Sequence, residues 1–186
     1  MVFSWTFFLT LVAACGIMLL LEWRGVPTTL SLTFKGDIKR ESRWLAQYGQ
    51  TTCNVVAIVL VGQLDRWPRA LPVLAATFGT FLVAGFVKKS LSRVRPGRPH
   101  AGRFLGPSLK RGNYKESFPS SHSACAAALS ATLAAFYPPA AMAFWALAIG
   151  CALLRYVLDA HWPSDVLAGI ALGYGCSCIT LYFLPG

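Results

Sequence analysis

Long apolar runs separated by short polar segments constrain this chain more than any other feature. Runs of about 17–25 residues with few charges can cross a bilayer as helices. Six stretches fit that description: about 2–22, 45–64, 70–87, 120–137, 140–158 and 163–184. Because lipid offers no partners to backbone polar groups, open segments that cross it must be helical. The sequence therefore predicts an all-α integral membrane bundle of six transmembrane helices, forming one domain over residues 1–186.

The first two apolar runs differ from an uninterrupted, internal membrane span. In 45–64 the apolar pattern is interrupted by Gln47, Gln50 and Asn54. The first run lacks the basic start of a signal peptide and stays apolar through Leu21, so we expect an uncleaved span. Between them, the polar and basic segment from Phe34 to Trp44 fits either a solvated loop or a short helix along the membrane surface. We expect the interfacial helix, starting near Asp37.

Polar residues gather on one side of the predicted membrane. Six spans put both termini on one face and the loops 23–44, 88–119 and 159–162 on the other, which we call the loop face. Of the 17 Lys and Arg residues, all but Arg66 and Arg69 fall on or beside the loop face. The three histidines His100, His122 and His161 lie there too.

The formal net charge of +10 would suggest nucleic acid as the partner of a soluble protein. Here only 13% of the residues are charged, against about 25% in a typical soluble domain. The basic residues lie between apolar runs, so phosphorylated headgroups in a membrane are the expected partners and nucleic acid is not. The oligomeric state is left open.

Three segments of the loop face carry candidate chemistry. The first runs from Lys88 to Pro96, where Lys88 and Arg95 are two helical turns apart and can point the same way. Two such cations suit a phosphate, although a charge cluster that stops membrane insertion would look similar. The proline ends the predicted helix directly after them.

The second segment, Phe118–Ser123, places small polar residues at the start of the fourth predicted span. Unpaired backbone N–H groups at a helix N-terminus attract anions, and His122 in the first turn could exchange protons. Capping of the helix by Ser120 or Ser121 is the simpler alternative.

The third segment, Arg155–Asp165, is the most specific. His161 precedes Pro163, which suits the first turn of the sixth span, and Asp165 lies one turn into it. The carboxylate can therefore orient one imidazole nitrogen and leave the other free to attack, as in a hydrolase triad. Capping by Asp165 is the alternative, but an ionisable residue in an apolar span is by default a functional candidate.

Together the three segments resemble the type-2 phosphatidic acid phosphatase superfamily, whose motifs are K-x6-R-P, P-S-G-H and S-R-x5-H-x3-D. The chain carries Lys88-x6-Arg95-Pro96, then Pro119-Ser120-Ser121-His122, then Leu154-Arg155-x5-His161-x3-Asp165. Ser121 replaces a glycine and Leu154 a serine, so lowered or shifted activity is the most that these departures imply. Every charged and imidazole group of the motifs is present.

The resemblance implies a metal-independent lipid phosphatase with no cofactor. His161 would attack phosphorus and form a phosphohistidine, Asp165 would orient His161, and His122 would serve the leaving group and then the water. The implied phosphate-binding residues are Lys88, Arg95, Arg155, Ser120 and Ser121.

Four substrates fit the resemblance: undecaprenyl pyrophosphate, phosphatidylglycerol phosphate, phosphatidic acid and the phosphate of lipid A. The basic loop 97–117 favours a headgroup with more than one negative charge. The resemblance also implies a bacterial inner membrane protein with its site facing the periplasm. The positive-inside rule points the other way, since Lys35, Lys39, Arg40 and Arg43 also lie on the loop face and have no role in the motifs.

Two other functions use the same residues. A vanadate-dependent peroxidase would bind vanadate in the phosphate site, but the members of the superfamily with that activity are soluble and much longer. A non-catalytic protein that binds or transports a lipid headgroup would need the cations but no oriented histidine.

Overall fold

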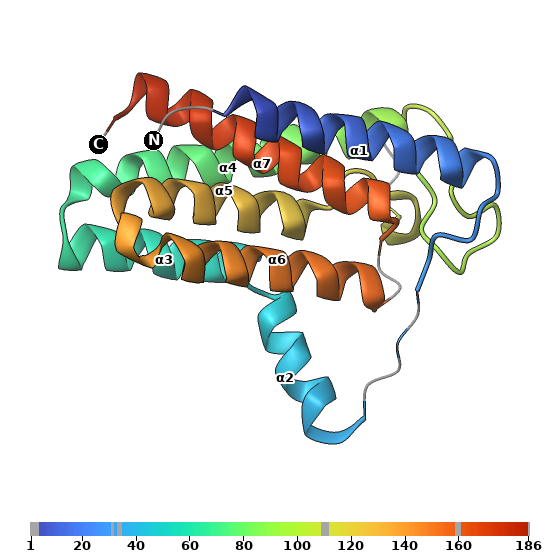
Figure 1. The fold of residues 1–186 in the computed structure, drawn as a ribbon, viewed down its shortest axis with the longest axis horizontal. Coiled ribbons are helices and arrows are strands. Elements are labelled where there is room, and N and C mark those ends of the chain that lie inside the picture. The colour runs from blue at the N-terminus through green and yellow to red at the C-terminus, as the bar shows by residue number, and fades with distance from the viewer. Residues whose placement is uncertain (1–3, 31, 33–34, 109–111, 159–160, 186) are drawn as a thin grey trace.

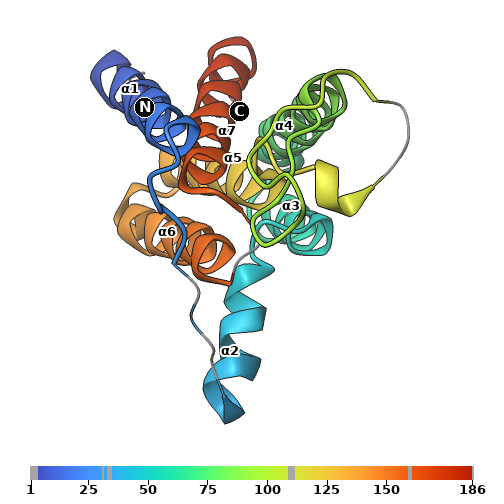
Figure 2. The same ribbon diagram turned by 90° about the vertical axis from the view of Figure 1, so that its right-hand side faces the viewer.

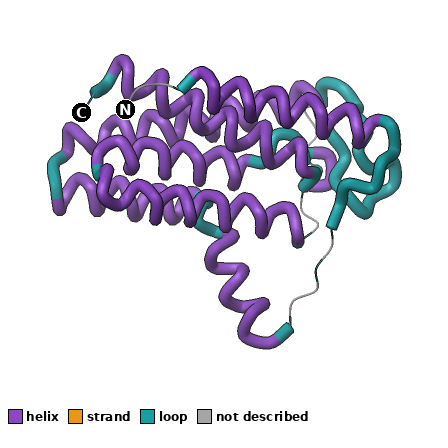
Figure 3. The backbone as a smooth tube through the Cα atoms, viewed as in Figure 1, coloured by secondary structure: helices purple, strands orange, loops and turns teal. Residues whose placement is uncertain are grey.

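The computed structural model describes residues 4–185 apart from 31, 33–34, 109–111 and 159–160. Helices and loops account for nearly all of them (Figure 3). The α-helices in chain order are α1 (Trp5–Trp23), α2 (Gly36–Ala46), α3 (Thr51–Leu64), α4 (Trp67–Leu91), α5 (Ser121–Phe136), α6 (Ala141–Val157) and α7 (Pro163–Phe183). Two short 3-10 turns, Asn113–Lys115 and Pro138–Ala140, precede α5 and α6.

Four of the described helical segments are long and apolar enough to cross a membrane: Trp5–Trp23, Trp67–Leu91, Pro138–Val157 and Pro163–Phe183. Large apolar side chains such as Phe78, Phe86 and Ile179 are more than half exposed on their outer surfaces, as expected for helices that face lipid. The chain is thus an all-helical integral membrane protein. The helices α3 and α5 are apolar but shorter, so the count of six spans stays a prediction.

The predicted span 45–64 is wrong as a single helix. Its first residues end α2, and α3 begins only at Thr51 after the turn Gln47–Gln50. The break has a packing reason, because a Cβ on Gly49 would lie 1.9 Å from the carbonyl oxygen of His122. The turn therefore rests directly on the start of α5, where a continuing helix with side chains would not fit.

The core of the bundle is α5. This helix packs against α4, α6 and α7, and all its residues from Ser123 to Ala134 are buried. Six of those twelve are alanines, which lets neighbouring backbones approach closely, as membrane helices without a hydrophobic driving force require. Figure 2, which looks along the bundle, shows α5 between α4, α6 and α7, while α1 covers α7 and α3 covers α4.

The ends of the bundle differ in character. Figure 1 shows both termini at one end, while the segments that link α1 to α2, α4 to α5 and α6 to α7 lie at or toward the other. This is the loop face that the alternation of spans predicts. The helix α2 leaves the bundle sideways, packing its last part against α6 (Figure 1). It begins at Gly36, with Asp37 in its first turn, and its placement at a membrane surface stays a prediction.

The close contact of α5 with α7 can be tested at Gly173. A Cβ there would lie 2.0 Å from the carbonyl oxygen of Ala124, so Gly173→Ala must push the two helices apart. We expect it to lower the free energy of unfolding in detergent by about 2 kcal/mol. Gly79→Ala on α4 is the matched control, since in the described chain nothing lies within 4 Å of its added Cβ. Equal thermal midpoints for the two variants would contradict the close packing.

Candidate active site

The three predicted segments meet at the loop end of the bundle. Lys88 lies in the last turn of α4, His122 in the first turn of α5 and Arg155 in the last turn of α6. His161 and Asp165 lie on either side of the start of α7. His122 lies within electrostatic range of Arg155, Lys88 and Arg95. His161 lies within range of Arg95, Asp165 and Lys88. The fold therefore brings both histidines, the carboxylate and the three cations of the motifs to one place.

His161 is a buried, neutral imidazole. Its side chain is 1% exposed, and burial, helped by the charge of Arg95 and opposed by Asp165, lowers its pKa to about 3. Nε2 lies 3.5 Å from Nη1 of Arg95. Nδ1 lies 3.6 Å from Oδ2 of Asp165, too long for a hydrogen bond. In the tautomer with the proton on Nδ1, the Nε2 lone pair points into the cluster of cations.

Asp165 has closer partners than His161. Its carboxylate accepts hydrogen bonds from Nη1 of Arg93 at 2.6 Å, from the hydroxyl of Ser117 at 2.5 Å and from the backbone N–H of Trp162 at 2.9 Å. The last of these is part of a capping box at the start of α7. The capping alternative for Asp165 is therefore observed, while its role in orienting the imidazole stays a prediction.

Arg93 was missed by the sequence analysis. Its guanidinium, 2% exposed, bridges Asp165 and Glu22, donating to an oxygen of Glu22 at 2.7 Å. It also donates to the hydroxyl of Ser164 at 2.7 Å and lies 5.3 Å from the ring centroid of Trp162. Glu22 in turn accepts from the backbone and hydroxyl of Ser164. The sequence did offer one signal of this bridge, because Glu22 is an acidic residue at the end of the first apolar run.

The remaining cations are held by backbone carbonyls. Lys88 Nζ donates to the carbonyl of Glu116 at 2.6 Å, and Nε of Arg95 donates to that of Asn113 at 2.7 Å. Nε of Arg155 is buried and has no hydrogen-bond partner within the described chain. These carbonyls orient Lys88 and Arg95 and carry no full charge of their own, so the arrangement suits an anion.

The start of α5 completes the site. Ser120 caps the helix, its buried hydroxyl accepting from the N–H of Ser123 at 3.4 Å, and its own N–H donates to the carbonyl of Asp165 at 2.9 Å. Ser121 and His122 lie in the first turn and are half-buried. The capping alternative is thus observed for Ser120, and its contact with phosphate stays a prediction. In the described residues, no group of three or more His, Cys, Asp and Glu side chains could hold a metal ion.

The buried bridge formed by Arg93 can be tested by Arg93→Met. The substitution leaves the carboxylates of Glu22 and Asp165 buried without their shared cation, so we expect the free energy of unfolding to fall by about 3 kcal/mol. Arg103→Met, at an exposed arginine of the same loop, should change it by less than about 0.5 kcal/mol. Thermal unfolding in detergent measures both, and equal midpoints would show that the bridge does not hold α1, α4 and α7 together.

The chain is similar in sequence to several known proteins. The PAP2 superfamily profile matches residues 69–186. The lipid A 1-phosphatase of Rhizobium johnstonii is 38% identical over 100 residues, which is 53% of this chain and 41% of that protein. The decaprenylphosphoryl-5-phosphoribose phosphatase of Mycolicibacterium smegmatis is 32% identical over 147 residues, 77% of this chain and 78% of that protein. This chain thus spans about two fifths of the lipid A 1-phosphatase it matches.

The fold has a solved counterpart. The crystal structure of the first transmembrane PAP2 type phosphatidylglycerolphosphate phosphatase from Bacillus subtilis superposes with a TM-score of 0.66 at 22% identity, covering 96% of this chain and 92% of that one. The resemblance predicted from the three motifs is confirmed by the profile, which spans all of them. The chain belongs to the PAP2 superfamily.

Proposed function

We propose that this chain is a membrane lipid phosphatase that hydrolyses a lipid phosphomonoester or pyrophosphate through a phosphohistidine on His161. The observation that carries the proposal is the environment of this imidazole. It is buried and neutral, and its Nε2 faces Arg95 within a group of cations. A neutral imidazole nitrogen is a nucleophile, and cations around it stabilise the charge that builds on a phosphoryl group under attack.

In the proposed first step Nε2 of His161 attacks phosphorus and the bond from phosphorus to the leaving oxygen breaks. His122 gives that oxygen a proton. In the second step His122 takes a proton from water, which attacks the phosphohistidine and releases inorganic phosphate and the free imidazole. The position of His122 in the first turn of α5, at the same end of the bundle as His161, supports this division of work.

The proposed phosphate cradle consists of Lys88, Arg95 and Arg155, with Ser120, Ser121 and the N–H groups at the start of α5. Charge-assisted hydrogen bonds to the nonbridging oxygens are the strong kind, and they strengthen as charge develops. The unpaired Nε of Arg155 supports this role, because a buried donor without a partner is costly until an acceptor binds. Asp165 offsets the positive charge that His161 gains on attack.

A lipid substrate is supported by the placement of the site at the end of an apolar bundle and by the relatives. Their names describe phosphatases that act on lipid A, on decaprenylphosphoryl-5-phosphoribose and on phosphatidylglycerol phosphate. We propose a bacterial inner membrane location with the site facing the periplasm, following the superfamily rather than the positive-inside rule. The six-span topology with α2 at the membrane surface is part of the same proposal.

The nucleophile can be tested by His161→Ala. We expect phosphate release to fall at least about a thousandfold while the thermal midpoint shows a folded protein. His100→Ala is the matched control, since His100 is an exposed histidine of the same loop face. Near-wild-type release from the His161 variant would exclude it as nucleophile. Tight binding of a phosphorylated lipid without any release by the wild type would instead favour the non-catalytic headgroup-binding alternative.

Metal independence is tested with a chelator. The proposed cradle neutralises phosphate with Lys and Arg side chains, so EDTA should leave the rate of phosphate release within about twofold of its starting value. Vanadate, which copies the geometry of a phosphoryl group under attack, should inhibit. Loss of activity in EDTA that Mg²⁺ restores would overturn the metal-free mechanism.

A further inference from the structure

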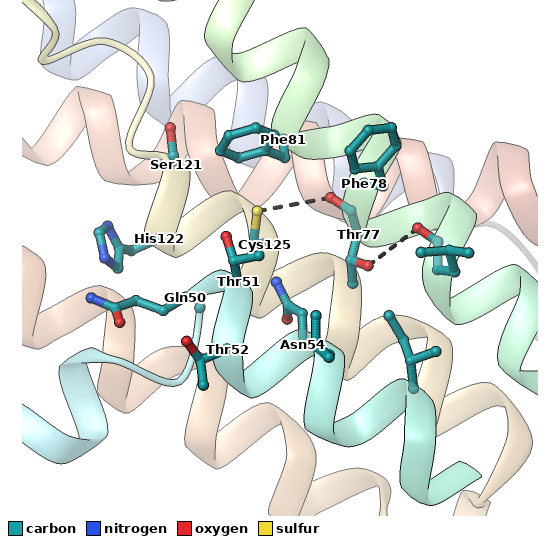
Figure 4. Close-up of a pocket in the computed structure, with 14 residues that line it drawn as sticks. Gln50, Thr51, Thr52, Asn54, Thr77, Phe78, Phe81, Ser121, His122 and Cys125 are labelled. Atoms are coloured by element: carbon teal, nitrogen blue, oxygen red, sulfur yellow. Dashed lines mark hydrogen bonds between the residues drawn. The ribbon is translucent and has the colours of Figure 1, made fainter. Parts of the chain in front are cut away.

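A groove of about 430 Å³ opens between α3 and α4 and reaches the start of α5. Ser121 and His122 line one end of it, and Figure 4 shows the imidazole of His122 at the edge of the space. His122 therefore belongs both to the groove and to the candidate active site. Its outer wall on α4 includes Phe78 and Phe81, each about half exposed on the surface that faces lipid. A lipid bound with its phosphate in the cradle would pass through this groove.

The lining changes along the groove. The start of α3 contributes polar side chains, Gln50, Thr51, Thr52 and Asn54, and Figure 4 shows them grouped on the side nearer His122. The next turn contributes Val55 and Ile58. The turn before α3 contacts His122 at Gly49, and α3 runs away from that contact. The polar part of the groove therefore lies nearer the candidate site, and the apolar part lies beyond it.

Asn54 is the decisive residue. Its side chain is 6% exposed, and its Oδ1 has no hydrogen-bond partner in the described part of the chain. An amide between membrane helices usually joins them through a hydrogen bond. Thr77 on the opposite wall does not supply that bond, because its hydroxyl donates to the carbonyl of Val73 in its own helix. A buried acceptor without a partner is costly. A donor that reaches Asn54 from the groove it lines would form the hydrogen bond that the described residues leave unmade.

We propose that Asn54 recognises a hydroxyl or amide N–H that the substrate carries close to its phosphate. This inference rests on the proposed function and narrows its substrate class. Asn54 lies three residues after the start of α3 at Thr51, so about 4–5 Å along the helix axis from the end nearest His122. A phosphate borne on a polyol or amino sugar places a hydrogen-bond donor at that range. A phosphate attached directly to a polyprenyl chain places only hydrocarbon there.

The experiment compares two phosphomonoesters on the purified full chain in detergent. Phosphatidylglycerol phosphate has a free hydroxyl on its phosphorylated glycerol, whereas farnesyl phosphate has no donor beside its phosphate. We expect the wild type to prefer the first in kcat/KM by at least about tenfold, the value of one hydrogen bond to a site that is otherwise left unpaired. Asn54→Leu should reduce this preference to about parity, by slowing the first substrate and not the second.

Two controls accompany the comparison. Val56→Ala alters a half-exposed residue of α3 that does not line the groove, and it should keep the wild-type preference. Asn54→Leu removes a buried unpaired amide, so its thermal midpoint should equal or exceed that of the wild type. Should this variant fail to fold, Asn54→Ala makes the same comparison.

The outcomes separate the two proposals. A preference unchanged within twofold in the Asn54 variants, or a wild-type preference for farnesyl phosphate, would overturn the role of Asn54 and leave the phosphatase intact. A wild type that releases phosphate from neither lipid would overturn the proposed function, and this inference with it.

Discussion

Positive charge gathered at the end of an apolar bundle has to be balanced, and the loop end of this protein is organised around that need. Buried cations are tolerated only with charged or hydrogen-bonding partners. Arg93 is balanced by the carboxylates of Glu22 and Asp165. Lys88 and Arg95 donate to backbone carbonyls, and Arg95 also contacts Nε2 of His161. Nε of Arg155 has no partner among the described residues. The first arrangement balances its own charge, whereas backbone carbonyls carry no full charge, as the proposed phosphate cradle requires.

The small residues of α5 make this gathering possible. Alanines at its centre and glycines of α7 bring backbones into contact, as at Gly173 against Ala124. Such contacts fix the relative heights of the helices, so that α4 and α6 end where α5 and α7 begin. The catalytic candidates come from those four helix ends and the adjoining loops. The spacing of these side chains therefore depends on backbone contacts inside the bundle, such as that of Gly173 with Ala124.

Much of this arrangement could be predicted from local sequence. The apolar runs predicted the positions of five helices: α1, α4, α5, α6 and α7. The alternation of spans predicted that their loops share one face. His161 and Asp165 lie close together in space because they are about one helical turn apart in the sequence. Each of these depends on residues close together in the chain, where helical periodicity decides the geometry. The family itself followed from three motifs of that kind.

Other features could not be predicted, because they depend on contacts between distant segments. The turn at Gly49 breaks the run 45–64 because α5 lies against it, and nothing local in that run gives the position of α5. The bridge from Glu22 through Arg93 to Asp165 joins residues 71 and 72 positions apart. Two cations two residues apart, Arg93 and Arg95, look equivalent in the sequence, and only the fold directs one inward to carboxylates and the other toward the imidazole.

This division of the two arginines explains how Asp165 can serve a neutral histidine. Counted as a unit, Glu22, Arg93 and Asp165 carry one net negative charge beside His161. In the proposed reaction the imidazole becomes positive when it is phosphorylated, and the unit then reaches neutrality. Without Arg93, two carboxylates would repel each other and the nearer would tend to bind a proton. Without Glu22, Arg93 would cancel Asp165 and leave nothing to offset the new charge. In the proposed mechanism, the ion pair of Arg93 with Glu22 therefore keeps Asp165 ionised and leaves its charge available to offset that of phosphorylated His161.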